Sequence, residues 1–342
     1  MMLGRDMGPT VQVDIVLVQH LLNFWDGRGA DILPILRALG ISEFGPLPPW
    51  IAADKLREAQ NRVEQQFTGS LIAAQSGRYL AERDLPMGRL MRCGENLAQS
   101  LPAALRFSHR SIGLASIQID AGEDCVVLHA GTADGSSLSH GECQQALAAV
   151  AVLCRNALAG TYQSGDIRIV FSCARDRQDE LSELLGVPVV QGDNCRTEIS
   201  ADAWIRINPD HHTHSFTNTL RELELKEKKL NEHLTLYTEL REIIGRCLMR
   251  RHVAQEDVAA QLGISVRNLQ RRLKALGTTY QVLLDESRQI LAMRLIEDYA
   301  IPLYEIAYMV GYAEPSAFYK AFKRWTGSTP GDYRAQALAS SL

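Results

Sequence analysis

The sequence lacks the features that define several large classes of protein. It has no apolar run near the roughly 18 residues that a membrane-spanning helix requires. The apolar stretch from Val11 to Leu22 is interrupted by polar residues and is followed by no small-residue cleavage site, so it does not fit a secretory signal. The seven cysteines include no CxxC pair and are widely spaced, which is typical of reduced thiols. We therefore expect a cytoplasmic protein without a membrane partner.

An overall excess of positive charge is also absent. The chain has 36 Lys and Arg against 40 Asp and Glu, a formal net charge of −4. The charges are unevenly distributed, because residues 237–336 contain 14 basic and 11 acidic residues while the remainder is acidic. The length of 342 residues and the ordinary globular composition predict two domains. The carboxy-terminal part is electropositive relative to the rest.

The pattern of the first 208 residues predicts an α+β domain. Up to residue 110 the apolar periodicity is helical and is punctuated by turn residues such as Gly40 and Pro86. Ser139 and Glu142 have the spacing of a capping box at the start of a helix. Beyond residue 113 we predict, in chain order, a hairpin of strands 115–119 and 125–129, a helix 139–158, a strand 167–171, a helix 179–185 and strands 187–190 and 197–199. The expected domain, residues 1–208, combines helices with a small mixed sheet.

Residues 209–236 are expected to form a linker and the start of a long helix. From residue 216 to 248 the chain is free of Pro, rich in Glu and Lys, and apolar at helical spacing. Two interpretations are open. The segment is either a connecting helix that packs on its own domains, or a dimerisation helix whose seam is formed by Leu220, Leu223, Leu230 and Leu234.

Residues 258–273 have the pattern of a helix-turn-helix unit. Ala259 is small enough for a close helix crossing, Gly263 supplies the left-handed residue of the turn, and Ser265 is expected to cap the second helix. The residues that can face one core are Val258, Leu262, Ile264, Leu269 and Leu273. The second helix must then direct polar side chains outward, namely Arg267, Asn268, Gln270, Arg271 and Lys274. Arg, Asn and Gln are the side chains that read base edges of DNA.

The same arrangement returns between residues 306 and 325. Ala307 is again the small crossing residue, Gly311 holds the turn, and Pro315 suits the first turn of the following helix. Ile306, Val310, Phe318 and Phe322 face inward, and Lys320, Lys323 and Arg324 face solvent. An amphipathic helix between the two units would hold them at a fixed distance. Residues 237–336 are therefore predicted to be an all-α domain with two helix-turn-helix units.

This domain resembles the AraC/XylS family of bacterial transcription regulators. The similarity is carried by Leu269–Leu273 and by Gly311, Tyr312, Ser316–Phe318, Ala321–Trp325, Gly327, Thr329, Pro330, Tyr333 and Arg334. The amino-terminal part resembles, less specifically, the effector-binding domain of the branch that includes ornithine-utilisation and virulence regulators. Its matching stretches are Gly29–Gly40, Ile169–Phe171 and Leu185–Val189.

The resemblance implies which side chains meet DNA. The base-reading positions would be Arg267, Gln270 and Arg271 in the first unit and Ser316, Tyr319 and Lys320 in the second; the outward direction of Asn268 adds it to this set. The residues expected at phosphates are Lys274, Lys323, Arg324 and Arg334. Two such helices on one rigid module can enter successive major grooves about 34 Å apart.

The resemblance also implies the function and the partners. We expect a sequence-specific transcription regulator, an activator, controlled by a small-molecule effector bound to residues 1–208. Its partners would be double-stranded promoter DNA, RNA polymerase and a second copy of the chain. A ligand-independent architectural DNA binder or a repressor is the alternative.

Catalysis and metal binding are not expected. His211, His212 and His214, beside Pro209, fit a solvated loop better than a metal site. Cys173 has no positioned His that would make it a nucleophile. A DNA alkylation-repair methyltransferase also contains an AraC-type half, but it would need clustered zinc cysteines and a Pro-Cys-His-Arg run, which this sequence does not contain. We predict no enzyme activity, no cofactor and no metal.

Overall fold

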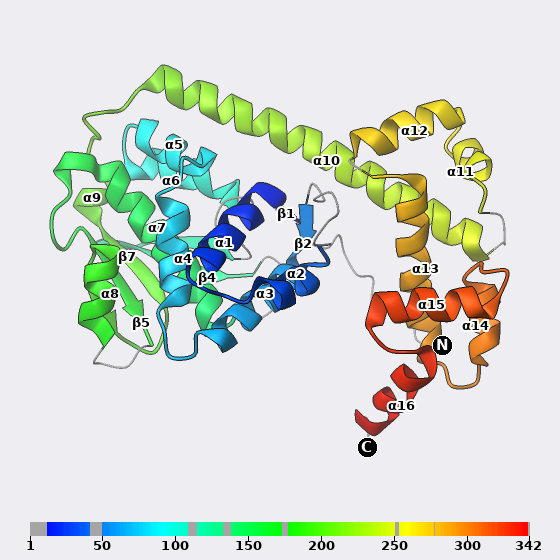
Figure 1. Cartoon of the computed structure of the whole chain (residues 1–342). Helices are drawn as coiled ribbons and strands as arrows, with labels where there is room; N and C mark the ends of the chain where they lie inside the picture. Colours follow the sequence, from blue (N-terminus) through cyan, green and yellow to red (C-terminus); the bar gives the residue numbers. More distant parts are fainter. Residues whose placement is uncertain are drawn as a thin grey trace. The chain divides into compact units, whose positions relative to one another are not determined.

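The computed structural model describes residues 12–41, 50–108, 115–132, 138–172, 177–249, 253–276 and 278–340. The chain divides into an amino-terminal unit, Met1–Lys226, and a carboxy-terminal unit, Glu227–Leu342 (Figure 1). The division lies inside the segment 209–236 that was expected to be the linker. The functional domain limits given above stay a prediction.

The amino-terminal unit is built of helices and two sheets. Its helices are α1 (Ile15–Gly27), α2 (Ile32–Leu39), α3 (Ala53–Gln66), α4 (Ile72–Ala81), α5 (Pro86–Cys93), α6 (Leu97–Leu105), α7 (His140–Leu158), α8 (Gln178–Leu185) and α9 (Ala201–Ile205). Helix α10 (Thr213–Met249) begins in this unit and ends in the next. A two-stranded antiparallel sheet of β1 (Gln12–Asp14) and β2 (Trp50–Ala52) was not predicted.

The larger sheet is mixed, as expected. Its strands are β3 (Ser116–Ala121), β4 (Cys125–Gly131), β5 (Ile167–Phe171), β6 (Val189–Gln191) and β7 (Arg196–Ser200), in the order β3-β4-β7-β5-β6. Among the described strands, β5 and β6 pair in parallel, and the β3–β4, β4–β7 and β5–β7 pairs are antiparallel. The predicted hairpin and the predicted strand 167–171 are confirmed, and the strand predicted at 187–190 begins two residues later.

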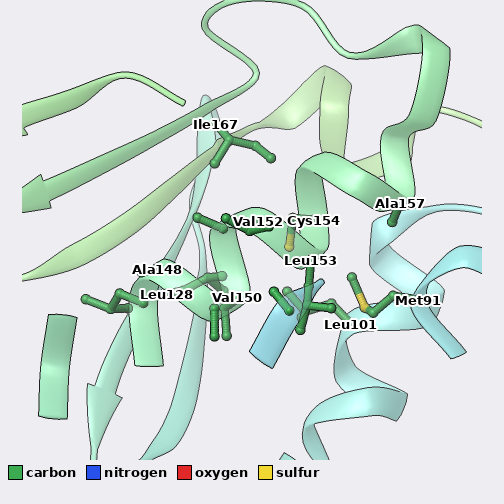
Figure 2. Packing of buried hydrophobic residues seen from close by; sticks show 14 of the residues in the cluster. Met91, Leu101, Leu128, Ala148, Val150, Val152, Leu153, Cys154, Ala157 and Ile167 are labelled. Atoms are coloured by element: carbon green, nitrogen blue, oxygen red, sulfur yellow. The ribbon is translucent and has the colours of Figure 1, made fainter. Parts of the chain in front are cut away.

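Helix α7 is the centre of the amino-terminal unit. The capping box at its start is confirmed, because Glu142 N donates to Ser139 Oγ at 3.1 Å and Ser139 N donates to Glu142 Oε2 at 2.7 Å. Figure 2 shows side chains of this helix, among them Val152 and Leu153, in one cluster with residues of the sheet and of α5 and α6. Burial raises the pKa of Cys154 in this cluster to about 12, so the thiol stays protonated.

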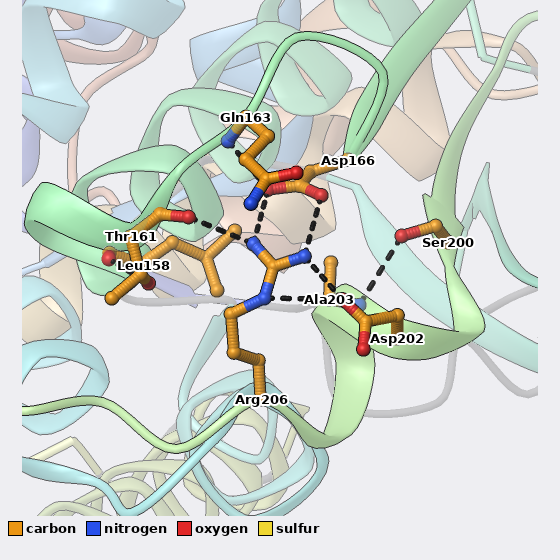
Figure 3. Close-up of polar contacts among 8 residues, drawn as sticks. All are labelled: Leu158, Thr161, Gln163, Asp166, Ser200, Asp202, Ala203 and Arg206. Atoms are coloured by element: carbon orange, nitrogen blue, oxygen red, sulfur yellow. Dashed lines mark hydrogen bonds and ion pairs between the residues drawn. The ribbon is translucent and has the colours of Figure 1, made fainter.

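A fork of hydrogen bonds fixes the chain where it leaves α9 (Figure 3). Arg206 donates from Nη1 to Asp166 Oδ2 at 2.6 Å and to the carbonyl of Thr161 at 2.8 Å, and from Nη2 to Asp166 Oδ1 at 2.9 Å. It also pairs with Asp202. Two residues on, Asn208 donates to the carbonyl of Arg92 at 2.7 Å. The segment that leads into α10 is therefore attached to the amino-terminal unit at two places.

The regular structure of the described carboxy-terminal unit is helical, and turns and short loops join its helices. After the end of α10 it contains α11 (Gln255–Gln261), α12 (Val266–Ala275), α13 (Tyr280–Ile296), α14 (Leu303–Met309), α15 (Pro315–Thr326) and α16 (Pro330–Ser340). Leu240, Ile243, Ile244 and Leu248 on the second half of α10 are buried. Among the helices of both units, as far as the structure describes them, none combines the length and apolarity needed to cross a membrane.

Candidate nucleic-acid interface

The first predicted helix-turn-helix unit is formed by α11 and α12. Gly263 adopts φ 64°, the left-handed conformation that the turn requires, and Ile264 N donates to the carbonyl of Ala259 at 3.0 Å. Asn268 N donates to Ser265 Oγ at 3.3 Å, which confirms the cap. The predicted inward residues Val258, Leu269 and Leu273 are buried, as is Ala259, and Leu262 and Ile264 are partly buried.

The second unit repeats this geometry with α14 and α15. Gly311 has φ 83°, and Tyr312 N donates to the carbonyl of Ala307 at 3.0 Å, the counterpart of the Ile264–Ala259 bond. Pro315 is the first residue of α15, as expected. Ile306, Ala307, Val310, Phe318 and Phe322 are all buried in one cluster with residues of α13. Both predicted turns are therefore built in the same way.

The recognition helix of the first unit presents a polar face. Arg267, Gln270, Arg271 and Lys274 are exposed, while Asn268 is half-buried. Arg271 Nη2 donates to Asn268 Oδ1 at 2.9 Å, and Gln270 Nε2 donates to Gln255 Oε1 at 3.1 Å. The predicted side chains thus lie on one helix, and one of them, Gln270, contacts Gln255 of α11, which the sequence analysis did not single out.

The second recognition helix has fewer side chains that could form two hydrogen bonds to one base. Ser316, Lys320, Lys323 and Arg324 on α15 are exposed, and Tyr319 is half-buried with its ring 5.9 Å from that of Phe318. Lys320 and Lys323 keep free ends toward solvent in the described structure, whereas Arg324 is paired within the unit. A phosphate would compete for Arg324 with its own carboxylate partner.

Helix α13 holds the second unit through Asp285 and Arg288. Arg324 Nη2 donates to Asp285 Oδ2 at 2.7 Å, and Arg288 Nη2 donates to the carbonyl of Gly311 at 2.9 Å. The Arg288 guanidinium lies 4.6 Å from the centre of the Tyr312 ring. Burial and the nearby Asp285 charge raise the pKa of Tyr312. The amphipathic pattern of residues 280–295 predicted this helix. It did not predict that polar residues of the helix bond to the second unit and to its turn at Gly311.

Arg334 makes contacts within its own unit. Its Nε donates to the carbonyl of Ile296, the last residue of α13, at 2.9 Å, and its Nη2 donates to the carbonyl of Asp298, just beyond the helix, at 2.7 Å. The guanidinium also lies 5.5 Å from the centre of the Tyr299 ring. A contact between Arg334 and phosphate stays a prediction, and these bonds give the side chain a structural role as well.

The expected dimerisation residues differ in their surroundings. Leu223 is 5% exposed, and both it and Leu220 pack with the core of the amino-terminal unit. That packing matches the connecting-helix interpretation for this part of α10. The side chains of Leu230 and Leu234 lie outside the described residues. Dimerisation through this helix remains a prediction.

The histidine cluster forms local contacts at the start of α10. His211 Nδ1 lies 2.8 Å from the carbonyl oxygen of Asn208, and His214 Nε2 lies 2.9 Å from Asn218 Nδ2. Within the described ranges, no three His, Cys, Asp or Glu side chains gather as metal ligands would. Cys173 lies outside those ranges.

Two matched turns, each followed by a helix with outward polar side chains, define a DNA-binding module of the helix-turn-helix class. Comparison with known proteins agrees: residues 258–336 match the family described as a helix-turn-helix domain. The chain is 47% identical to the ornithine utilization regulator of Pseudomonas aeruginosa over 79 residues. This segment makes up 23% of each of the two chains. Over 127 residues it is 32% identical to the transcriptional regulator VirS of Mycobacterium tuberculosis, which is 37% of each chain.

Among solved structures, the chain is similar to the transcriptional regulator CdpR from Pseudomonas aeruginosa, with 21% identity, a TM-score of 0.40 and coverage of 93% of this chain and 98% of that one. The matched part spans 23% of the ornithine utilization regulator and 37% of VirS, and both are described as regulators. The matched part, residues 258–336, is therefore similar to the helix-turn-helix domain of transcription regulators. The resemblance of the amino-terminal part to an effector-binding domain stays a prediction.

Proposed function

We propose that this chain regulates transcription by binding promoter DNA with both helix-turn-helix units, under the control of a small molecule bound to its amino-terminal unit. The observation that carries the DNA-binding part is the repetition of one turn geometry. Gly263 and Gly311 are both left-handed, and the bonds from Ile264 N to Ala259 O and from Tyr312 N to Ala307 O are both 3.0 Å. A helix that presents polar and cationic side chains follows each turn.

Base contacts and phosphate contacts are assigned to different side chains of the DNA-binding unit. On α12, Arg267, Gln270 and Arg271 are exposed and carry the donors and acceptors that base edges pair with. Lys274, Lys323, Arg324 and Arg334 are assigned to phosphates, where they release counterions and make affinity depend on salt. Ser316, Tyr319 and Lys320 on α15 are residue types that read bases less often than Arg and Gln. The first unit therefore determines most of the sequence preference.

The binding site on DNA should be asymmetric for one chain. Two helices of one module enter successive major grooves about 34 Å apart, roughly one helical turn, when they share a face of the duplex. A homodimer would then cover two such half-sites. As an activator, the protein would bring RNA polymerase to the adjacent promoter.

Control by an effector is supported by the architecture of the chain. The amino-terminal unit has its own cores and a mixed sheet, and it leads into α10, which continues into the DNA-binding unit. The bonds of Arg206 and Asn208 tie the start of that helix to the unit. A ligand that alters the amino-terminal unit can thereby act on the chain that leads to the DNA-binding unit.

Selection from a library of randomised DNA duplexes tests the proposal. The full-length protein should enrich a two-part sequence whose halves are about one helical turn apart, with binding that weakens steeply as salt rises. Failure to enrich any sequence would refute sequence-specific binding. Mass spectrometry of small molecules that co-purify with the protein, followed by transcription with purified RNA polymerase with and without each candidate, tests effector control and activation.

A further inference from the structure

Gln255 reaches from the first helix of the first unit to its recognition helix. It is the first residue of α11, and it precedes the residues matched by the helix-turn-helix family, which begin at 258. Its side-chain carbonyl Oε1 accepts a hydrogen bond from Gln270 Nε2 at 3.1 Å. The bond spans 15 residues and crosses the turn at Gly263, so it exists only when α11 and α12 are packed as a unit.

In the structure the Gln270 amide is turned with its nitrogen toward Gln255, where it is the donor of the bond. A primary amide has two N–H groups on one side and an acceptor oxygen on the other, and a half-turn of the amide exchanges the two ends. When one N–H is given to Gln255, the nitrogen is fixed on the side of α11. One N–H and the Oε1 of Gln270 remain for a ligand. In the major groove, adenine presents the matching pair, the N7 acceptor and the N6 amino donor.

We propose that Gln255 is a positioning residue that orients the Gln270 amide to read an adenine-containing base pair. This inference rests on the proposed function, because it assumes that α12 enters the major groove. Without the bond, the exposed Gln270 side chain rotates freely and its amide can turn to suit several bases. Gln255 therefore contributes to preference among bases, not to the charge that attracts DNA.

The arrangement differs from the second polar contact on this helix. Arg271 Nη2 donates to Asn268 Oδ1 at 2.9 Å, but these two residues are three apart on α12 itself. That contact forms wherever the helix forms and leaves the guanidinium with several other donors. Of these two contacts, only the one with Gln255 makes the orientation of a base-reading side chain depend on the packing of α11 against α12.

The experiment uses the full chain and a library of randomised DNA duplexes. The wild-type protein defines the preferred site, and Gln270→Ala identifies the base pair whose preference depends on Gln270. Dissociation constants are then measured for four duplexes that differ only at that pair. Gln255→Met, which keeps the length of the side chain but has no strong acceptor, should lower the preference for adenine by about fivefold or more, since a good bidentate contact discriminates by roughly that factor or better.

Three companion variants distinguish positioning from a general structural effect. Gln255→Glu keeps an acceptor and should retain the adenine preference while its negative charge weakens binding to all sequences. In the Gln270→Ala background, Gln255→Met should cause no further change in preference. Gln281→Met, the same substitution at an exposed glutamine of α13, should leave preference and affinity unchanged.

The possible results separate this inference from the proposed function. If Gln270→Ala abolishes a preference that Gln255→Met leaves intact, Gln255 is not a positioning residue and DNA recognition by α12 stands. The same conclusion follows if the affected pair contains no adenine. If the wild-type protein selects no sequence at all, the proposed function fails and this inference fails with it.

Discussion

The carboxylate of Asp285 on α13 accepts a hydrogen bond from Nη2 of Arg324 on α15, with 2.7 Å between the two atoms. The same carboxylate lies 3.4 Å from both Trp325 Nε1 and the hydroxyl of Tyr312, each of which donates to it. One carboxylate on α13 thus accepts hydrogen bonds from three donors of the second helix-turn-helix unit. Arg324 is consequently held by a carboxylate of its own unit, and the proposed phosphate contact would have to replace this pair.

Asp285→Ala should destabilise the carboxy-terminal unit by about 1–2 kcal/mol, since the variant leaves the donors of Tyr312 and Trp325 without this acceptor. The ion pair itself contributes little of this, because the Arg324 side chain is 65% exposed and such pairs are worth about 0–1 kcal/mol. Differential scanning calorimetry of the full chain measures the effect. Glu297→Ala, at an exposed position just after α13, serves as control, and an equal change in both variants would contradict the role of Asp285.

Arg271→Ala and Lys323→Ala should weaken DNA binding in different ways. Loss of Arg271, a proposed base reader, should cost about 1–3 kcal/mol on the preferred sequence and relax the preference at one base pair. Loss of Lys323, a proposed phosphate contact, should weaken binding to all sequences alike and flatten the dependence of log affinity on log salt by about one unit. Titrations on specific and random duplexes at several salt concentrations compare the two. Equal losses on both kinds of DNA for both variants would refute the assignment.

The sequence predicted features that depend on neighbouring residues and missed features that depend on residues far apart in the chain. The strand 167–171 and the Ser139–Glu142 capping box were predicted because a short run of strand-forming residues and a capping pair both depend on neighbouring residues. The three-residue strands β1 and β2 were missed, because so short a stretch carries no periodicity and their pairing joins residues 12–14 to 50–52.

The recognition-helix residues were found for the same reason, since helical spacing alone separates Leu269 and Leu273 from Arg271. Gln255 and Asp285 were missed because their partners, Gln270 and Arg324, are 15 and 39 positions away. Nothing in the local pattern of a polar residue on a helix tells which distant donor it will meet. The packing of α11 on α12 and of α13 on α15 decides those pairs.

Arg206→Met should destabilise the amino-terminal unit by about 3 kcal/mol at neutral pH, because it leaves the Asp166 carboxylate charged and almost buried, with its side chain 6% exposed. Burial tends to raise the pKa of Asp166, but the hydrogen bonds and charge of Arg206 outweigh it and hold the pKa below its ordinary value of 3.8. A carboxyl with a lowered folded-state pKa stabilises the fold above its unfolded pKa and loses that contribution as the pH falls.

The difference in unfolding free energy between wild type and Arg206→Met should therefore be greatest above pH 3.8 and should shrink as the pH falls through the lowered pKa of Asp166. Urea unfolding over a series of pH values measures it. Lys226→Met, which breaks an exposed pair with Glu222, should change stability by no more than about 0.5 kcal/mol. A pH-independent difference would show that the Asp166 charge is not what Arg206 stabilises.

Gly77→Ala and Gly245→Ala, two helical glycine substitutions, should change stability in opposite directions. A Cβ at Gly77 on α4 would stand 2.2 Å from the backbone oxygen of Gln145 on α7, so the two helices would have to separate, at a cost of about 2–3 kcal/mol. A Cβ at Gly245 on α10 would meet nothing within 4 Å, so alanine there should stabilise the helix by about 0.5–1 kcal/mol. Thermal unfolding of both full-length variants provides the comparison. A neutral Gly77→Ala would mean that α4 and α7 do not need the close approach that the buried centre of the amino-terminal unit is built on.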